Sequence, residues 1–254
     1  AFCKDHLLPM ASAIWSAPVV DVLSFPALPF IKFHENHGLL QIFGRPKWET
    51  VSGGSITYVR RLAAAVNGEL RLGVGVASVC RHPGGVEIQD SLGRVERFDH
   101  AVIASHADEA LTMLSDATRL EQELLRTFQY RRNKAVLHSD SSLMPRRRSA
   151  WASWNYVENA GQSPYFTYWM NRLQGIPEDY PLFVTLNPPR APAAGMTHRV
   201  EIYDHPVFTV DTMAAQRRLW TLQGQNRTWF CGAHFGSGFH RSEEHTSELQ
   251  SPYV

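Results

Sequence analysis

The amino-acid sequence predicts a mixed α/β (α+β) protein in which two domains are interleaved along one chain. Short alternating strands with glycine turns are typical of a nucleotide-binding sheet, and they occupy residues 46–108 and 223–240. Helical patterns and aromatic, strand-like segments fill residues 1–45 and 109–222. Because the two kinds of segment alternate, a simple tandem order of domains is not expected.

Composition and charge exclude several classes of protein. The chain has 254 residues, 44% of them hydrophobic, and a formal net charge of +1, so it is not expected to bind nucleic acid. Its three cysteines, Cys3, Cys80 and Cys231, are too dispersed for a disulfide framework or a zinc cluster, which favours a reducing, cytoplasmic location. No apolar run approaches the roughly 18 residues of a membrane span.

The first 69 residues predict short helices and then a longer one. Four prolines, Pro9, Pro18, Pro26 and Pro29, interrupt the apolar helical patterns of residues 1–45. Gly53 and Gly54 then form a tight turn that leads into an amphipathic helix, which Ser55 can cap. The apolar residues that recur at helical spacing in this helix are Ile56, Val59, Leu62, Ala63 and Val66.

A β-rich passage and a helical passage follow. Three segments predict an antiparallel meander: "LRLGVGVASVCR", "GGVEIQD" and "RVERF". The next segment, "DHAVIAS", is a short continuous apolar strand of the type found in parallel sheets that are covered on both faces. The passage "ADEALTMLSDATRLEQELLRTFQY" has apolar residues at helical spacing throughout.

The second half of the chain predicts a sheet rich in aromatic residues. Four segments are strand-like: "NKAVLHSDSSLMP", "SAWASWNYV", "YFTYWMNRL" and "PLFVTLNP". One more helix, "DTMAAQRRLWTLQG", precedes "RTWFCGAHFG", a strand that runs into a glycine turn. A turn of this kind presents backbone N–H groups to a ligand.

Several long strings of this sequence resemble one family. They are "LLPMASAIWSAP", "ENHGLL", "RPKWETVSGGSITYV", "FDHAVIASHADEAL", "AVLHSDSSLMPRRRSAWASWNY" and "HPVFTVDTMAAQRRLWTLQGQNRTWFCGAHFGSGFH". Over residues 1–240 the chain resembles bacterial NAD/FAD-binding proteins of the flavin-containing amine oxidase superfamily. The resemblance implies a two-domain flavoprotein fold, with an FAD domain (46–108 and 223–240) interleaved with a substrate domain (1–45 and 109–222).

The sequence departs from the family pattern at both ends. The family's N-terminal GxGxxG turn and its acidic ribose-binding residue are not found, and we expect them upstream of Ala1. After His240 the family continues into a helix that faces the flavin, whereas residues 241–254 read "RSEEHTSELQSPYV". This tail is similar to a translated sequencing adaptor, so we expect it to be an artefact and exclude it from the fold.

The resemblance implies a set of residues that contact FAD. Gly53 and Gly54 would lie beside the flavin ring, because residues without a Cβ allow the backbone to approach it closely. The alternative is a simple turn before a helix. The other implied contacts are Val76 at the adenine, Ser105 and His106 after a buried strand, and Gly232, Ala233, Gly236, Gly238 and Phe239 at the pyrophosphate and ribityl chain.

Three further groups of residues have competing interpretations. Cys231 and His234 are candidates for covalent attachment of flavin, although a buried free cysteine usually acts as a small hydrophobic residue. The segment "MPRRRSAWASWNY" is either a basic rim and aromatic wall for an acyl or phospholipid substrate or a packed core beside a solvated strand end. His34 and His37 lack further ligands at metal-binding spacing, so no metal is expected.

Together these patterns predict an FAD-dependent oxidoreductase that takes hydride from a small organic or lipid substrate. In this class the cofactor supplies the reactivity, so no catalytic side chain is assigned. We expect no transmembrane segment, and peripheral membrane contact and the oligomeric state are left open. The alternatives are a lipid-binding or scaffold protein that retains a flavoprotein fold without turnover, and an enzyme that uses NAD(P) alone.

Overall fold

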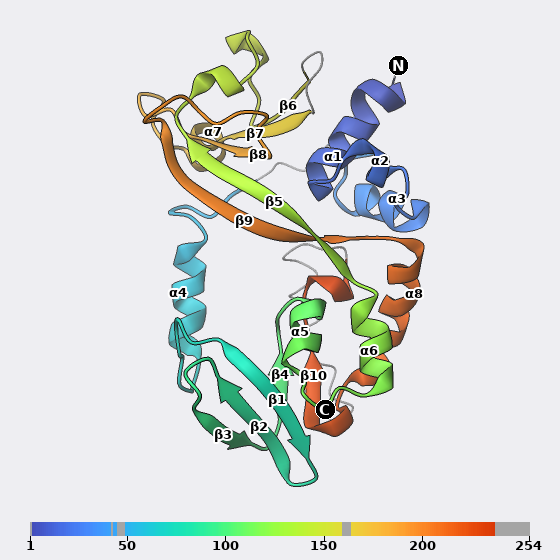
Figure 1. Ribbon diagram of the computed structural model, residues 1–254. Coiled ribbons are helices and arrows are strands. Elements are labelled where there is room, and N and C mark those ends of the chain that lie inside the picture. Colours follow the sequence, from blue (N-terminus) through green and yellow to red (C-terminus); the bar gives the residue numbers. More distant parts are fainter. Residues whose placement is uncertain (1, 42, 45–48, 159–163, 237–254) are drawn as a thin grey trace. The chain divides into compact units, whose positions relative to one another are not determined.

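The computed structural model describes residues 2–41, 43–44, 49–158 and 164–236 and divides the chain into two compact units. Unit 1 comprises Ala1–Ser24, Gly44–Glu69 and Arg131–His205. Unit 2 comprises Phe25–Phe43, Leu70–Tyr130 and Pro206–Val254. Each unit is therefore built from three separate stretches of the chain (Figure 1). The boundaries of the flavin and substrate domains stay a prediction.

Unit 1 contains short helices and an aromatic sheet. Its helical elements are η1 (Cys3–Leu7), α1 (Leu8–Trp15), α2 (Val19–Val22), α4 (Ile56–Ala65), η2 (Ser141–Leu143), η3 (Arg148–Ala150) and α7 (Met170–Gln174). The strands of the sheet are β5 (Gln129–His138), β6 (Trp154–Val157), β7 (Tyr165–Trp169), β8 (Phe183–Leu186) and β9 (Thr197–Val207), in the order β6-β7-β8-β5-β9. The four aromatic segments predicted as strands are confirmed by β5, β6, β7 and β8, although the third ends in the short helix α7.

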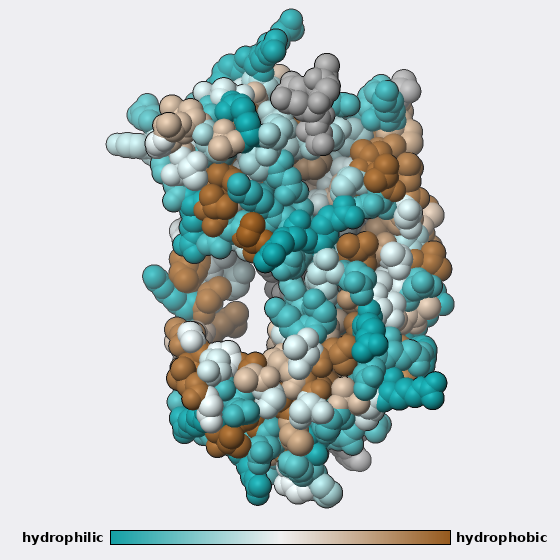
Figure 2. Space-filling view, viewed as in Figure 1, coloured by the Kyte–Doolittle hydropathy of each residue, from teal (hydrophilic) through white to brown (hydrophobic). Residues whose placement is uncertain are grey.

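Helix α4 begins at the predicted glycine turn, but its apolar residues are exposed. Gly53 and Gly54 have φ angles of +82° and +81°, a conformation that favours glycine. Ser55 occupies the N-cap position without a side-chain hydrogen bond, so its predicted capping role is wrong. The hydroxyl of Thr57 instead donates to the carbonyl of Gly54 at 2.8 Å. Figure 2 shows hydrophobic residues at the surface in the region of α4, where Leu62 is 64% exposed.

Unit 2 combines the predicted meander with a parallel strand pair. Strands β1 (Val76–His82), β2 (Gly85–Asp90) and β3 (Val95–Phe98) form an antiparallel sheet, and β4 (Ala101–Ile103) pairs in parallel with β10 (Thr228–Phe230). The helical elements are α3 (Ala27–Asn36), α5 (Ala107–Met113), α6 (Arg119–Arg126), α8 (Val210–Leu219), η4 (Trp220–Leu222), η5 (Gln225–Arg227) and η6 (Ala233–Phe235). The meander and the parallel strand are confirmed, but the predicted cover on both faces of that strand is wrong: Ala101 and Ile103 are buried, whereas Val102 between them is 56% exposed.

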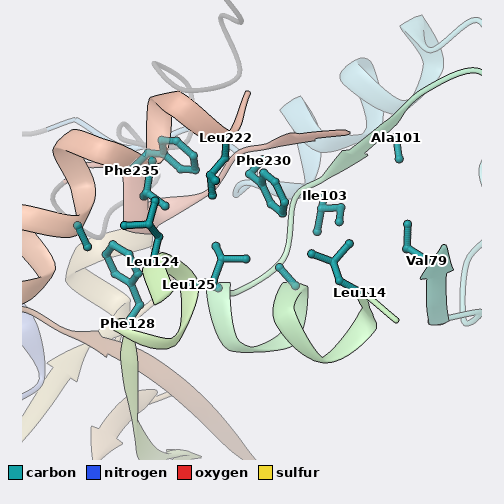
Figure 3. Packing of buried hydrophobic residues seen from close by; sticks show 14 of the residues in the cluster. Val79, Ala101, Ile103, Leu114, Leu124, Leu125, Phe128, Leu222, Phe230 and Phe235 are labelled. Atoms are coloured by element: carbon teal, nitrogen blue, oxygen red, sulfur yellow. The ribbon is translucent and has the colours of Figure 1, made fainter. Parts of the chain in front are cut away.

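One hydrophobic core joins the helices and the parallel pair of unit 2. Ile103 and Phe230 lie opposite each other in the register of β4 and β10, and both are buried. Figure 3 shows their side chains near Leu114 and Leu125, which come from the α5–α6 region. Because burial of apolar area stabilises a fold by roughly 25 cal/mol per Å², this cluster holds the ends of β4 and β10 firmly in place.

Two features of the chain differ from the sequence prediction. The continuous helical pattern after Ala107 forms two helices, because Leu114 leaves the helix to bridge Val79, and Thr118 and Glu121 form a capping box that starts α6. Strand β9 was not predicted at all. In the described part of the chain, no helix has the length and apolarity needed to cross a membrane.

Candidate functional site

The carboxyl ends of β4 and β10 lie side by side in unit 2. The two strands are parallel, and the N–H of Cys231 extends the pairing by donating to the carbonyl of Ile103 at 3.0 Å. Ser105 and Gly232 therefore leave the same edge of the sheet. In α/β proteins, this edge is where ligands bind.

Gly232 is confined at this edge by its two neighbours. Its φ angle is +144°, which disfavours any residue with a side chain. A Cβ at this position would lie 3.1 Å from the imidazole of His234 and 3.4 Å from the carbonyl oxygen of Ser105. The structure thus brings the predicted residues Ser105 and Gly232 together, and it explains why residue 232 is glycine.

The turn after Gly232 is held by a side chain that the sequence analysis missed. Gln216 of α8 donates from Nε2 to the carbonyls of His234 (2.9 Å) and Gly236 (2.6 Å). The N–H of Phe235 and the N–H of Gly236 are used within the turn itself. Among the described residues, no acceptor is found for the N–H groups of Ala233 and His234. These donors remain available at the ligand-binding edge.

His106 begins α5 and is fixed by an aromatic contact. Its ring stacks on Tyr130 with 4.3 Å between the centroids and 14° between the planes. The hydroxyl oxygen of Tyr130 accepts a hydrogen bond from the N–H of Ala107 at 2.9 Å. Burial raises the pKa of Tyr130 well above its ordinary value, so the phenol stays neutral. His106 is thus positioned as part of the helix start.

His234 is a buried, neutral imidazole at the same place. It is 2% exposed, its ring lies edge-on to Phe128, and its Nε2 has no hydrogen-bond partner among the described residues. Burial, followed by the positive field of His106, lowers the pKa of His234 to about 4. The sequence analysis considered this residue only for covalent attachment, a role that stays a hypothesis.

The remaining predicted cofactor contacts lie in other places. Gly53 and Gly54 belong to unit 1, so their position next to the β4–β10 edge stays a prediction. Val76 is the first residue of β1, pairs with Asp90 and is 43% exposed. Its contact with adenine is also untested. Gly238 and Phe239 lie outside the described residues, as does the predicted artefactual tail 241–254.

The aromatic residues of the predicted substrate wall divide between a core and a pocket of unit 1. Trp151 packs edge-on against Trp169 and Phe183, and the Arg148 guanidinium lies 3.8 Å from the ring centroid of Trp151. Arg148 also pairs with Glu178. For Trp151 and Arg148, the structure therefore favours the packed-core alternative.

Trp154 and Tyr156 line a pocket of about 370 Å³. Its walls come from the η1–α1 segment and from strands β6 and β7. The residues of the lining are Asp5, His6, Pro9, Met10, Ala13, Trp154, Asn155, Tyr156, Phe166 and Tyr168. The aromatic part of the predicted wall is thus present, but no arginine or lysine is among the lining residues.

The histidine pair of α3 has a structural role. The Nδ1 atoms of His34 and His37 donate to the carbonyls of Phe30 and Phe33, four residues earlier, both at 2.8 Å. These bonds tie each ring to its own helix. Within the described residues, no group of three or more His, Cys, Asp or Glu side chains has a metal-binding arrangement.

Three solved structures are similar in fold to this chain. A CLA-producing fatty acid isomerase from P. acnes matches with a TM-score of 0.54 and 14% identity, over 78% of this chain and 52% of that chain. A protein from Exiguobacterium sp. 255-15, provisionally identified as a protoporphyrinogen oxidase, matches with a TM-score of 0.58 and 11% identity, over 91% of this chain and 59% of that chain. A putrescine oxidase variant with redesigned cofactor binding matches with a TM-score of 0.51 and 10% identity, over 77% of this chain and 52% of that chain.

At these identities the likeness establishes the fold alone, and this chain spans roughly half to three fifths of the length of those structures. No curated protein matches the sequence. The model of one protein family, described as flavin-containing amine oxidoreductase, matches residues 3–174. The match covers more than half of the sequence. This chain belongs to the flavin-containing amine oxidoreductase family.

Proposed function

We propose that this chain forms part of an FAD-dependent oxidoreductase in which hydride passes from a carbon atom of an organic substrate to the flavin. Membership of the family implies FAD as the cofactor and oxidoreductase as the class of enzyme. The observation that carries the proposal is the position of Gly232, where the ends of two parallel strands meet and a Cβ would not fit. When bound, FAD supplies the redox chemistry, and the protein supplies orientation and a dry environment.

The residues at the β4–β10 edge fit a dinucleotide. The N–H groups of Ala233 and His234 have the chemistry that a phosphate requires, and Gln216 fixes the turn that presents them. The carbonyl of Ser105 and the neutral ring of His234 lie beside Gly232. We propose that this turn holds the pyrophosphate, and that Gly53 and Gly54 adjoin the flavin ring.

We propose a lipid or fatty-acyl molecule as the substrate, with an amine as the competing class. One similar structure is named as a fatty acid isomerase and another as a putrescine oxidase, so the fold accommodates both. A lipid-binding protein without turnover is the alternative function, which the aromatic pocket of unit 1 would suit because its residues need no flavin. We further propose a cytoplasmic location.

Anaerobic spectroscopy of the full-length gene product tests the proposed function. Purified protein should carry FAD, and an oxidisable substrate should bleach its visible absorbance as hydride reaches the flavin. The panel should contain fatty acids, fatty-acyl esters and primary amines. Retained flavin that no compound bleaches, together with saturable lipid binding, would support the alternative. A full-length protein that cannot be loaded with FAD would contradict both the cofactor and the reaction.

The 254-residue chain by itself is expected to hold FAD weakly and to be inactive, because it spans only part of the flavoproteins that share its fold. Desalting after incubation with excess FAD measures retention. Substituting Gly54→Val in the full-length protein should lower the flavin content while circular dichroism stays unchanged, because a branched side chain would occupy the proposed flavin face. Undiminished flavin would place Gly54 away from the cofactor.

A further inference from the structure

One wall of the unit 1 pocket is a face of β6 and β7 that carries four aromatic side chains. In the antiparallel register of β6 and β7, Trp154 lies opposite Tyr168, and Tyr156 lies opposite Phe166. Directly opposed residues share one face of a sheet, so all four aromatic side chains point to the same side. The other face of β7 is buried, whereas Phe166 and Tyr168 are only partly buried and Trp154 is 49% exposed. Four partly exposed aromatic rings therefore form one wall.

The aromatic rings are held in place by one another. The rings of Trp154 and Tyr168 meet edge to face, with 5.9 Å between centroids and 81° between planes. The rings of Tyr156 and Phe166 are tilted by 53° at 5.4 Å. Such arrangements leave part of each negative ring face directed away from its partner. A ligand that enters the pocket meets a wall that attracts positive charge.

The charged groups around this wall are acidic. Asp5 lines the pocket from η1, and within the described residues its carboxylate forms neither an ion pair nor a hydrogen bond. Tyr156 forms a hydrogen bond with Glu158, which together with burial raises the pKa of the Tyr156 phenol. The lining contains His6 but no lysine or arginine. Among the described residues, the lining thus offers no lysine or arginine to pair with a carboxylate or phosphate ligand.

We propose that this pocket binds a quaternary, fully methylated ammonium group carried on a small organic molecule. Cations of this type bind over aromatic faces, with a gain of about 0.5–2 kcal/mol per contact that depends on desolvation. They present no N–H donors, so they need no hydrogen-bond acceptors. A primary ammonium has three strongly hydrated N–H donors that must lose water to rest on aromatic rings, whereas a fully methylated ammonium has none.

This assignment is independent of the proposed flavin chemistry. A quaternary nitrogen has no lone pair to stabilise the iminium that hydride loss from its neighbouring carbon would form, so its binding here is recognition and not amine oxidation. The residues concerned belong to unit 1, whereas the β4–β10 turn belongs to unit 2. The proposal can therefore be tested with the 254-residue chain, without flavin.

Isothermal titration calorimetry with choline at constant ionic strength tests the proposal. We expect saturable binding of choline, and binding at least about tenfold weaker for its neutral isostere, in which tert-butyl replaces trimethylammonium. A primary alkylammonium and a carboxylate of similar size should also bind more weakly. Vesicles of phosphatidylcholine form a separate arm, because the same headgroup chemistry occurs in lipids. Binding to vesicles but not to free choline would assign the group to a lipid.

Substitutions locate the binding. Trp154→Ala should weaken choline binding about tenfold, because it removes an aromatic ring face that the cation contacts. Asp5→Asn should weaken it about threefold, because it removes a partly solvated negative charge. Trp220→Ala removes a similarly exposed tryptophan (48%) from unit 2, and Asp179→Asn removes an exposed carboxylate of unit 1 outside the pocket; neither should change the affinity. Equal affinities for choline and its neutral isostere, or choline binding unaffected by Trp154→Phe and Trp154→Ala, would overturn the assignment.

Discussion

The side-chain amide of Gln223 pairs with both backbone groups of Phe230. Its Nε2 donates to the carbonyl of Phe230 at 2.7 Å, and its Oε1 accepts the N–H of Phe230 at 2.8 Å. The amide thus has the donor and acceptor pattern of a peptide in a neighbouring strand. Because β4 pairs with the other edge of β10, Gln223 satisfies the edge that would otherwise be open at Phe230.

Replacing Gln223 should destabilise unit 2. In Gln223→Leu, the two backbone groups of the fully buried Phe230 lose their partners, which costs about 2–4 kcal/mol of unfolding free energy. Urea unfolding measures the loss, and amide exchange at Phe230 should accelerate. Gln225→Leu, at an exposed position two residues away, serves as the control. Equal midpoints for the two variants would show that the edge pairing contributes little.

The buried ion pair of Arg81 with Glu121 predicts a second effect. Nη1 and Nη2 of Arg81 donate to the two carboxylate oxygens at 2.8 and 2.9 Å, and both side chains are 2% exposed. Arg81→Met would leave the Glu121 carboxylate buried without its cation and should cost about 3–5 kcal/mol. Thermal unfolding of Arg218→Met gives the control, because Arg218 pairs with Glu123 at the surface.

The double variant Arg81→Met with Glu121→Gln separates two explanations of that loss, because glutamine has no charge but keeps the capping box with Thr118. If the penalty comes from an uncompensated charge, the second substitution should recover most of the stability. If the double variant is as unstable as Arg81→Met alone, packing around the arginine is responsible instead.

Local patterns predicted most strands, and their failures have physical causes. β9 follows a turn at Gly195, but it alternates charged residues with Val200 and Ile202, which are both 46% exposed. No buried face therefore marked it as a strand. The helical spacing before α5 and α6 hid a break, although the Thr118–Glu121 capping box was readable in the sequence. Helix α4 was predicted, but the helical spacing of its apolar residues does not show which part of the protein packs against them.

The candidate site was only partly predictable for a similar reason. Gly232 was found because a glycine turn after an apolar strand is a local signal. Gln216 and Gln223 act through contacts with residues 7 to 20 positions away, and no sequence period encodes them. Trp154 and Tyr156 were identified, whereas their opposite partners became known only from the strand register.

Gly232 should not tolerate even a methyl group. Gly232→Ala combines an unfavourable φ with a Cβ placed 3.1 Å from the His234 ring, so the turn must move. We expect a loss of about 2–3 kcal/mol in the chain and a large fall in FAD content of the full-length protein. Gly93→Ala is the matched control, because φ is +85° there and an added Cβ meets no neighbour. A Gly232→Ala protein that retains full stability and flavin would contradict the close approach.

Protonation of His234 should make unit 2 sensitive to mild acid. The folded pKa is about 4, below the value of about 6.5 for a free histidine, so the unfolded chain binds the proton more readily. The contribution of neutral His234 to the free energy of unfolding is therefore fully present above pH 6.5 and is lost as the pH falls through about 4. Its size follows from this difference and is on the order of 3 kcal/mol.

Urea unfolding at several values of pH measures this effect. In His234→Phe, which keeps an aromatic ring but cannot be protonated, the fall in unfolding free energy between pH 6.5 and pH 4 should be much smaller than in the wild type. The carboxyl group of Glu121 does not interfere with this measurement. Burial raises its pKa, but the hydrogen bonds from Arg81 and Thr118 and the positive charge of Arg81 together lower the pKa below its ordinary value, so it titrates at lower pH. His100→Phe, at an exposed histidine of the same unit, should retain the wild-type slope. Identical slopes for wild type and His234→Phe would mean that the imidazole of His234 is solvated in solution and that its burial at the β4–β10 edge is wrong.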